Sequence, residues 1–189
     1  MKKAVKGTYG YLKRKRTLVM IRTIIFFGIA LALFAAGYIT THTKRNLLTV
    51  VAVLGCLPAC KSLVNLIMYF RASGCSESAY QQIIKAEGRL IGMFDMYFTS
   101  YQKNYAVSHM VVEDRIILAY TEDKGCDLLS CREHLENMLK QAGYKDMTIT
   151  VNNDLSKYCE QLRGLNDKKD ACASAKDDEV RVVLYEISL

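Results

Sequence analysis

Two apolar stretches decide the fold of this 189-residue chain: TIIFFGIALALFAAGYI at Thr23–Ile39 and LLTVVAVLGCLPACKSLVNLIMYF at Leu47–Phe70. The first stretch has no charged residue, and the second has only Lys61. A helix of about 20 residues crosses the roughly 30 Å hydrocarbon core of a bilayer, so each stretch is long enough to span it. Only the polar residues 40–46 separate them, which forces the two helices to run antiparallel. We therefore expect a transmembrane helical hairpin over residues 18–70.

The first stretch also has the basic flank of a cleaved signal peptide. Ala35-Ala36-Gly37 weakly resembles a cleavage site for such a peptide. The apolar run is long for a signal peptide, however, and a second apolar run follows almost at once. The hairpin is therefore the favoured interpretation.

The distribution of charge predicts how the hairpin is oriented. Residues 1–70 contain eleven Lys or Arg residues and no Asp or Glu, and most of the basic residues precede the first apolar stretch. The link between the stretches contains only Lys44 and Arg45. Because basic flanks stay on the cytoplasmic side, we expect both termini to be cytoplasmic, as in a bacterial-type plasma membrane. The basic N-terminal segment, residues 1–17, would then lie near anionic lipid headgroups.

The remainder of the chain, residues 71–189, carries the opposite charge. It contains the other fifteen basic residues and all nineteen acidic residues, which gives a net charge of −4. Domains that bind nucleic acid usually offer a basic surface, so the expected partner is a protein and not a nucleic acid. A cytoplasmic location also predicts that its five cysteines, Cys75, Cys126, Cys131, Cys159 and Cys172, are thiols, and the odd total of seven cysteines in the chain agrees.

Small residues indicate how the two helices would pack. Gly28, Ala32 and Ala36 recur every four residues on the first helix, and Gly55 and Ala59 have the same spacing on the second. Small side chains let helix backbones approach closely in lipid, where hydrophobic burial provides no driving force. We expect both ridges to lie at helix–helix contacts.

Lys61 is the one ionisable residue inside the second stretch, and Asn65 follows it one helical turn later. Intramembrane charges are costly and often functional, and residues 1–70 offer no carboxylate to pair with this lysine. Lys61 would then contact a lipid phosphate, a carbonyl freed near Pro58, the soluble domain or another protein. Alternatively, the span is shorter and Lys61 extends to the interface beside a more polar last turn.

Periodicity and capping residues predict a compact α/β domain over residues 71–189. Ser76 and Asp154 are suited to cap the N-termini of helices, and Gly143 is suited to end one. The expected elements are a helix at 76–87, strands at 90–101, 105–112 and 115–121, a helix at 128–142, a strand at 147–151, a helix at 154–163 and a strand at 180–187. The expected order is therefore α-β-β-β-α-β-α-β.

The adjacent strands at 105–112 and 115–121 are followed by Glu122-Asp123-Lys124, which has the form Glu-x-Lys. In this order of elements, residues 80–151 resemble restriction-endonuclease-like domains, including nuclease-related domains of membrane-anchored bacterial proteins. In such nucleases an acidic residue on one strand and a Glu-x-Lys on the next hold a metal ion and activate water.

The resemblance implies catalytic roles for Asp95, Glu122 and Lys124. Two positions depart from the family pattern, because Ser108 stands near the expected strand acid and Tyr120 near the expected glutamate. The resemblance therefore implies either a metal-dependent nuclease or a degenerate nuclease-like domain. Of the two, the degenerate domain is the favoured expectation.

Cys126, Cys131 and His134 form the pattern Cys-x4-Cys-x2-His, and Cys159 or Cys172 would be a fourth ligand. Zinc prefers four nitrogen or sulfur ligands, and structural sites usually show tighter paired spacings. The alternative is that Cys131 and Cys159 are core residues and that His134 is solvated. We favour this second interpretation and expect no metal.

The sequence contains no glycine-rich phosphate-binding loop, no nucleophile elbow and no His-Glu-x-x-His motif. We therefore expect no cofactor, and we expect His109 to be a half-buried strand residue. Three functions remain as hypotheses. The leading one is a non-enzymatic, membrane-anchored module that binds a protein or acts as a scaffold. The second is a metal-dependent nuclease, and the third is a thiol or metal sensor at Cys126, Cys131 and His134.

Overall fold

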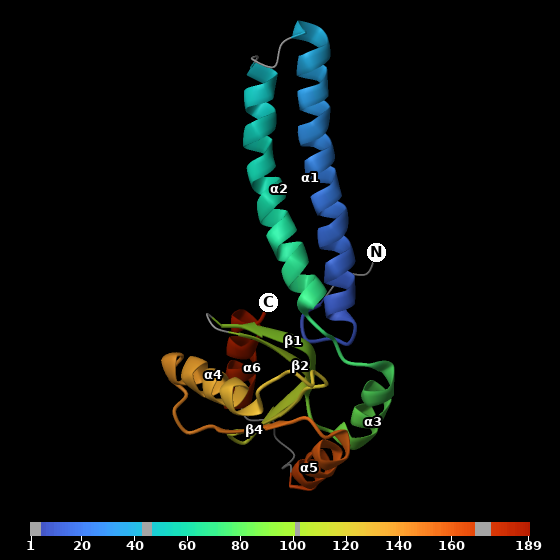
Figure 1. Cartoon of the computed structure of the whole chain (residues 1–189). Coiled ribbons are helices and arrows are strands. Elements are labelled where there is room, and N and C mark those ends of the chain that lie inside the picture. The colour runs from blue at the N-terminus through green and yellow to red at the C-terminus, as the bar shows by residue number, and fades with distance from the viewer. Residues whose placement is uncertain (1–4, 43–46, 101–102, 169–174) are drawn as a thin grey trace. The chain divides into compact units, whose positions relative to one another are not determined.

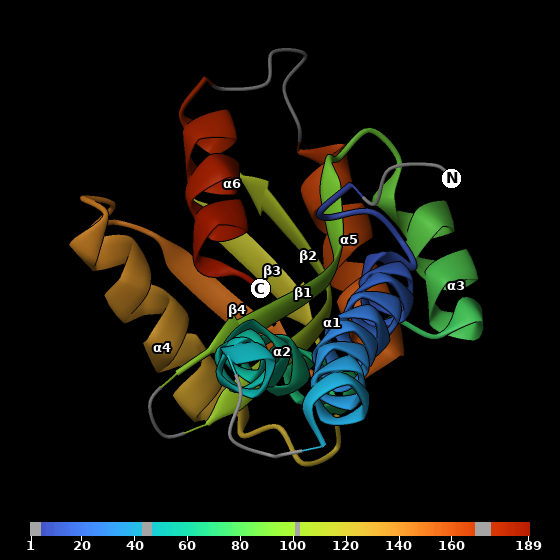
Figure 2. The ribbon, with the colours of Figure 1, turned by 90° about the horizontal axis from the view of Figure 1, so that it is seen from above.

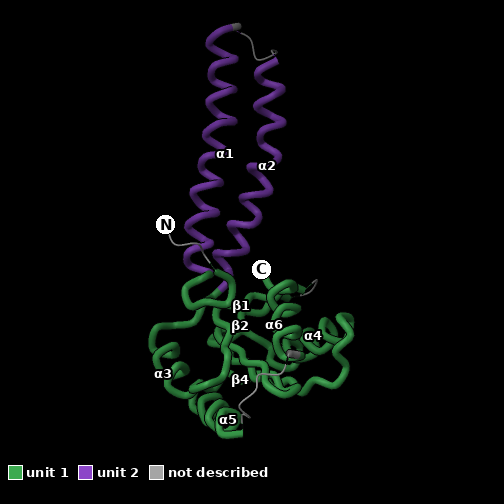
Figure 3. Tube along the Cα trace, turned by 180° about the vertical axis from the view of Figure 1, so that it is seen from behind, with its two compact units in different colours: residues 1–11, 73–189 green, residues 12–72 purple. Residues whose placement is uncertain are grey.

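The computed structural model describes residues 5–42, 47–100, 103–168 and 175–189 (Figure 1). The chain divides into two compact units, which are coloured separately in Figure 3. One unit, residues 12–72, is a helical hairpin, and the other, which we call the α/β unit, comprises residues 73–189 together with residues 1–11. Each unit is described in turn.

The hairpin consists of α1, Tyr11–Thr41, and α2, Leu47–Arg71. Both helices are long and apolar enough to cross a membrane, by length and composition, which confirms the prediction of two long apolar helices. The predicted link at residues 40–46, with Lys44 and Arg45, lies largely outside the described residues.

The two helices meet along a seam of small and short polar side chains. Thr23 Oγ1 and Ser62 Oγ are 2.8 Å apart across the seam, and Gly55 faces the Ala30 side chain. Successive buried positions are three, four or seven residues apart, as in the heptads of left-handed coiled coils. These positions are Val19, Thr23, Ala30 and Gly37 on α1, and Ala52, Ala59 and Ser62 on α2.

The ridge expected on the first helix is not part of this seam. Gly28, Ala32 and Ala36 are exposed, whereas Ala59 is fully buried and Gly55 is partly buried. Residues spaced strictly by four rotate around the helix away from a contact line that repeats every 3.5 residues. The i, i+4 ridge on α1 therefore points away from α2, and only the pair on α2 lies at the helix contact.

The α/β unit has a mixed four-stranded sheet with the order β1-β2-β3-β4. The first three strands are antiparallel neighbours, and β4 pairs with β3 in parallel. The elements are α3 Glu77–Glu87, β1 Gly92–Thr99, β2 Asn104–Glu113, β3 Ile116–Tyr120, α4 Leu128–Gln141, β4 Thr148–Asn152, α5 Leu155–Asp167 and α6 Ala175–Ile187. This confirms the predicted α/β class.

Helices cover both faces of the sheet (Figure 2). Helices α4 and α6 pack on one face, which we call the α4/α6 face, and α3 and α5 pack on the other, the α3/α5 face. The α4/α6 face buries a cluster that includes Met96, Val107, Met110, Leu135, Leu139 and Leu184. The α3/α5 face buries Ile83, Phe94, Val111, Tyr158 and Leu162.

Local sequence signals set the helix ends as predicted. Ser76 Oγ accepts a hydrogen bond from Ala79 N at 3.2 Å, which caps the start of α3. Asp154 Oδ1 accepts from the backbone nitrogens of Ser156 and Lys157 at the start of α5. Such caps satisfy amide groups that the helix itself leaves without acceptors.

The prediction of a strand at 180–187 is wrong, because these residues belong to helix α6. The β-branched run Val180, Val182 and Val183 favours a strand locally. However, Val180 and Leu184 are spaced by four residues and are both buried, so helical burial against the sheet prevails. The order of elements is thus α-β-β-β-α-β-α-α, and only an isolated bridge joins Ser188 to Phe98.

Both ends of the described chain cover the outer edge of β1. The Phe94 amide donates to the Gly7 carbonyl, and the Leu189 amide donates to the Tyr97 carbonyl, each at 2.8 Å. Part of the predicted basic segment therefore packs on the α/β unit. The Tyr9 ring stacks there on the Tyr80 ring of α3, with a distance of 4.0 Å between the ring centroids.

Candidate functional site

Asp95, the first candidate catalytic residue, lies at a break in the sheet. It has a positive φ of 55°, which a non-glycine residue seldom adopts, and it does not pair with Ser108 although the neighbouring positions pair in register. The alternation of side chains changes phase there, so Phe94 and Asp95 face the same side. Asp95 is only 2% exposed, and regular strand alternation, which would place it on the opposite face from Phe94, does not hold here.

The Asp95 carboxylate holds the segment that leads into α3. Its Oδ1 accepts a hydrogen bond from Cys75 N at 2.8 Å. Gly74 lies so close that a Cβ at this position would come within 2.8 Å of the same oxygen. The buried carboxylate therefore serves a backbone amide, which explains how its burial is tolerated.

Glu122, the second candidate, serves the next residue of the same segment. Its Oε2 accepts from Ser76 N at 2.8 Å, and its Oε1 accepts from Ser76 Oγ at 2.7 Å. Its own amide donates to Ser108 Oγ at 3.2 Å. The structure thus brings Asp95 and Glu122 to the same segment, where each accepts from the backbone of Cys75 or Ser76.

A hollow of about 700 Å³ lies beside Glu122, at the carboxyl ends of the parallel strands β3 and β4. Ligands of α/β proteins often bind at this position. Its lining includes Ser76, Tyr120, Thr121, Glu122, Asp123, Lys124, Asn153, Asp154 and Leu155.

The acidic side chains of this hollow already accept backbone hydrogen bonds. Asp123 Oδ1 accepts from Gly125 N at 2.9 Å, and Asp154 caps α5. Burial and the nearby Glu122 raise the pKa of Tyr120 to about 12, so its phenol stays protonated at neutral pH. Lys124 is exposed. The groups are engaged in holding loops and helix ends, which leaves few of them available to a ligand.

A buried polar chain crosses the α3/α5 face, and no sequence motif predicted it. His109 is fully buried rather than half-buried, and its Nδ1 lies 2.7 Å from the Tyr158 hydroxyl. Its Nε2 lies 3.7 Å from Glu87 Oε1. Burial lowers the pKa of His109, against a smaller opposing effect of Glu87. The imidazole is therefore neutral near pH 7.

Gly92 makes room for this chain. A Cβ at Gly92 would lie 2.1 Å from both Glu87 Oε1 and His109 Nε2. Real Cβ atoms do not approach heavy atoms so closely, so glycine is required for this close approach. The sequence does not group these residues, because Glu87, Gly92 and Tyr158 lie on α3, β1 and α5 and only the fold brings them together.

The three proposed zinc ligands do not form one site. Cys126 packs against the buried cluster that contains Cys131, whereas the His134 ring packs on Tyr105 with a centroid distance of 5.4 Å. The described ranges contain no group of three or more His, Cys, Asp and Glu side chains that could hold a metal ion. Cys172 lies outside the described residues.

A second, smaller hollow follows the outer edge of β4. It has a volume of about 160 Å³ and is lined by Leu128, Leu129, Arg132, Ile149, Thr150 and Val151. Leu129 is 66% exposed, which is high for a leucine on a folded domain. Among the described residues, no strand pairs with this edge of β4.

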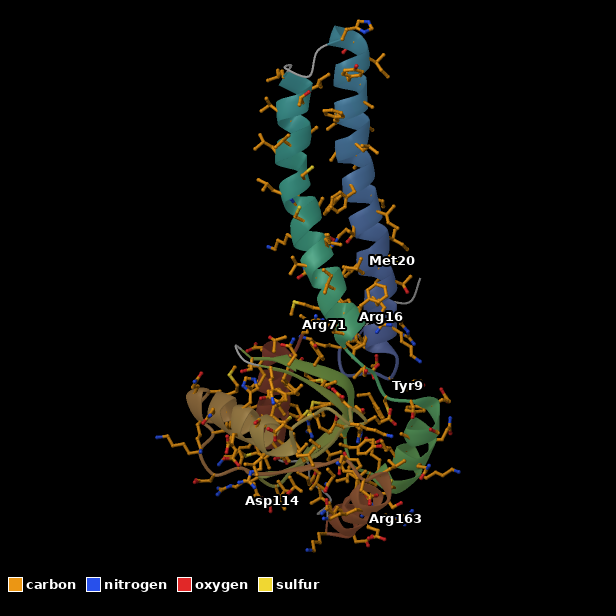
Figure 4. All side chains as sticks on the ribbon, in the orientation of Figure 1. Tyr9, Arg16, Met20, Arg71, Asp114 and Arg163 are labelled. Atoms are coloured by element: carbon orange, nitrogen blue, oxygen red, sulfur yellow. The ribbon has the colours of Figure 1, made fainter. Side chains whose placement is uncertain are left out.

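The polar residues of the hairpin differ in exposure. Lys61 is exposed and Asn65 is partly buried, whereas the polar contact between the helices is made by Thr23 and Ser62. Arg16 Nε donates to the Tyr69 carbonyl at 3.1 Å, near the C-terminal end of α2. Figure 4 labels Arg16 and Arg71 at this end of the hairpin.

Comparison with known proteins gives no match: no protein-family model, no curated protein and no solved structure matches the chain. By its own elements, the chain combines a hairpin of two long apolar helices with a three-layer α/β unit.

Proposed function

We propose that this protein is a membrane-anchored, non-enzymatic binding module. In this proposal α1 and α2 span a bilayer with both chain ends on the cytoplasmic side, as in a bacterial plasma membrane. The α/β unit then binds an extended segment of a partner protein along the outer edge of β4. The observation that carries the proposal is the contrast between the two edges of the sheet: one is covered, and the other has no strand paired with it within the described ranges.

The hairpin supports the anchoring part of the proposal. Large apolar side chains point outward along both helices, for example Ile24, Leu31 and Leu57, which are 64%, 69% and 67% exposed. Such surfaces are stable in lipid and prone to aggregation in water. The exposed Lys13 and Arg14 flank the start of α1 and suit anionic headgroups.

Extraction of cell membranes with alkaline carbonate tests the anchoring. We expect the protein to stay in the membrane pellet, and full release into the supernatant would contradict anchoring.

The edges of the sheet support the binding part. An uncovered edge strand presents unpaired backbone donors and acceptors, and natural proteins usually cover such an edge or place charges on it. Here Gly7 and Leu189 hydrogen-bond to β1, so that edge is protected. The β4 strand, TITVN, carries no charge, and the exposed Leu129 lies beside it. These features suit a partner segment that adds a strand to β4 and places an apolar side chain in the hollow beside Leu129.

The pairing of β4 with β3 identifies the free backbone groups. Thr148 N donates to Arg115 O, and Asn152 O accepts from Thr121 N, so the even-numbered residues of β4 face β3. In a parallel pair alternate residues bond to one neighbour. The N–H and C=O groups of Ile149 and Val151 therefore point to the open edge. A partner strand would pair with these two residues.

A photo-crosslinking amino acid at Leu129, in the full chain expressed in cells, tests this site. We expect a crosslinked product in which mass spectrometry identifies a partner protein. Val151→Pro removes a donor that faces outward and spares the bonds to β3, so it should reduce the product at least tenfold. The same amino acid at Ile84, an exposed residue of α3, is the matched control.

The outcomes of this experiment separate the alternatives. A Leu129 product that persists in Val151→Pro would contradict strand addition, as would equal products from Leu129 and Ile84. A product that contains only a second copy of this chain would replace the partner protein with a homodimer. Thermal unfolding of the purified variant checks that Val151→Pro leaves the fold intact.

The metal-dependent nuclease remains an untested alternative. It would require Asp95 and Glu122 to leave the backbone of Cys75 and Ser76 before both could reach one ion. We expect no Mg²⁺- or Mn²⁺-dependent cleavage of DNA or RNA by the purified full chain. Cleavage that is lost in both Asp95→Ala and Glu122→Ala would favour the nuclease over the binding module.

A further inference from the structure

Cys126 and Cys131 occupy the two positions that meet across the first turn of α4. Cys126 directly precedes the N-cap Asp127, and Cys131 is the fourth residue of the helix. Apolar residues at these positions commonly pack together and set the angle at which the chain enters the helix. Here both positions are thiols. The arrangement is therefore a hydrophobic staple built from two groups that can be oxidised.

The two thiols pack in the same cluster but differ in exposure. Cys131 is fully buried in the cluster on the α4/α6 face, and Cys126 packs against that cluster from a partly exposed position. Solvent reagents thus reach Cys126 first, and Cys131 lies deeper in the same cluster.

The two neighbouring thiols also differ chemically. The Cys131 side chain lowers the pKa of Cys126 despite burial and the nearby Asp123, and the Cys126 side chain raises the pKa of Cys131 together with burial. Because the thiolate is the reactive form, Cys126 is the better nucleophile and Cys131 remains a thiol. This is the division of roles found in a peroxide-reactive cysteine and its resolving partner.

The other described thiols lack this combination. Cys75 and Cys159 are buried on the α3/α5 face, and burial raises the pKa of Cys159. Cys56 and Cys60 lie on α2 within the apolar hairpin. A third donor for a metal ion is absent from the described surroundings of Cys126 and Cys131. The pair is thus suited to redox chemistry and not to zinc.

We propose that Cys126 and Cys131 are a reversible redox site that a peroxide converts into an intramolecular disulfide. The Cys126 thiolate attacks one peroxide oxygen, so an S–O bond forms, the O–O bond breaks and hydroxide leaves. The Cys131 sulfur then attacks the Cys126 sulfenic acid, so the S–S bond forms and water leaves. Two thiols lose two electrons and two protons, and hydrogen peroxide is reduced to two molecules of water.

The reverse step requires a dithiol reductant. Its thiolate attacks one sulfur of the disulfide, and its second thiol completes the exchange and releases both cysteines in the reduced form. This site does not depend on the binding proposed for the β4 edge. Loss of one function in a variant therefore leaves the other testable.

Tryptic cleavage after Lys124 and Arg132 isolates the site in one peptide, Gly125–Arg132, which contains both cysteines and no other. The full chain in detergent is treated with hydrogen peroxide, alkylated and digested. We expect this peptide to lose two hydrogens and to resist alkylation, and we expect dithiothreitol to reverse both changes. The peptide that contains Cys159 is the internal control and should stay alkylated.

The variant Cys131→Ser removes the resolving thiol. Its Cys126 sulfenic acid should persist, and dimedone should label it at least tenfold more than in the unsubstituted chain. An unsubstituted chain whose Gly125–Arg132 peptide stays fully alkylated after peroxide treatment would overturn the proposal, even if the variant does not fold. Equal dimedone labelling of both proteins, or one zinc ion per chain in the purified protein, would also overturn it.

Discussion

The two faces of the sheet are stabilised in different ways. The α4/α6 face buries a large cluster of methionine, valine, leucine and aromatic side chains, and α6 also buries Asp177 and Arg181. The α3/α5 face buries Asp95, Ser108 and His109 among its apolar residues. Apolar packing depends on volume and shape, whereas each buried polar group depends on a particular partner. The α3/α5 face should therefore tolerate substitution far less well.

The cause of this difference lies in two facing positions. Asp95 and Ser108 interrupt the register of β1 and β2, and the alternation of side chains changes phase in both strands. Ser108 and His109 consequently both face α3 and α5, as Phe94 and Asp95 do. One local break thus places two pairs of neighbouring residues on the same face and concentrates polar groups there.

The strongest test of the comparison is Gly92→Ala on the α3/α5 face. The added Cβ would collide with Glu87 Oε1 and with the fully buried His109. We expect the free energy of unfolding of the full chain in detergent to fall by about 3 kcal/mol, at the upper end for overpacking.

Gly164→Ala is the matched control for that prediction. Gly164 lies inside α5, and a Cβ there would meet nothing within 4 Å. This variant should be more stable by about 0.5–1 kcal/mol, because alanine favours helix. Similar losses of stability in both alanine variants, measured by chemical unfolding, would contradict the steric explanation.

The second prediction concerns Asp95→Ala. The substitution leaves the buried Cys75 amide without its acceptor, so we expect a loss of about 2 kcal/mol in unfolding free energy. Asp95→Asn retains an oxygen that can accept and should cost less than half as much. If the asparagine variant is as unstable as the alanine variant, the charge of Asp95 matters more than the hydrogen bond to Cys75.

The third prediction uses pH. Burial lowers the pKa of His109 in the folded protein, so below the ordinary value of about 6.5 the unfolded chain binds a proton that the folded chain does not. Stability is then fully present above pH 6.5 and falls as the pH drops toward the lowered value, by at most about 1.4 kcal/mol per pH unit.

A titration of unfolding free energy from about pH 7.5 to about pH 5, above the ordinary pKa range of carboxylates, checks this prediction. His109→Gln should flatten the curve. Burial also lowers the pKa of the half-buried His134, so His134→Gln should flatten it to a smaller extent. A curve that is unchanged in His109→Gln would show that this histidine is not the titrating group.

The smallest effect is expected on the α4/α6 face. Leu139 is fully buried there, and Leu139→Met preserves its volume. We expect a loss of less than about 1 kcal/mol by thermal unfolding, because cores tolerate such exchanges. A loss as large as that of Asp95→Ala would remove the distinction between the two faces.

Much of the fold could be predicted from local signals. Ser76 and Asp154 cap helices where the sequence places them, and the turn between β2 and β3 falls at Asp114 and Arg115, within one residue of the expected position. For α6, which was predicted as a strand, the sequence does contain a helical signal. The acidic residues Asp177 and Asp178 precede Val180 and Leu184 as they would in the first turn of a helix.

The candidate sites were less predictable. Asp95 and Glu122 were identified as carboxylates near adjacent strands, but their partners are the amides of Cys75 and Ser76, which belong to another part of the chain. The pattern of Cys126 and Cys131 was visible in the sequence. Whether the two side chains pack together depends on where α4 begins, because the first helical turn brings residue 126 next to residue 131.

The sequence by itself determined the two apolar helices, the α/β class of the unit that follows and most helix and strand positions. Length, charge distribution, periodicity and caps are properties of neighbouring residues, so they can be recognised without a structure. The tertiary structure alone decided which faces the side chains occupy: the exposed Gly28 ridge, the break at Asp95, the contact of His109 with Tyr158 and the open edge of β4. Each of these depends on residues far apart in the chain, and close packing fixes their contacts only after the elements assemble.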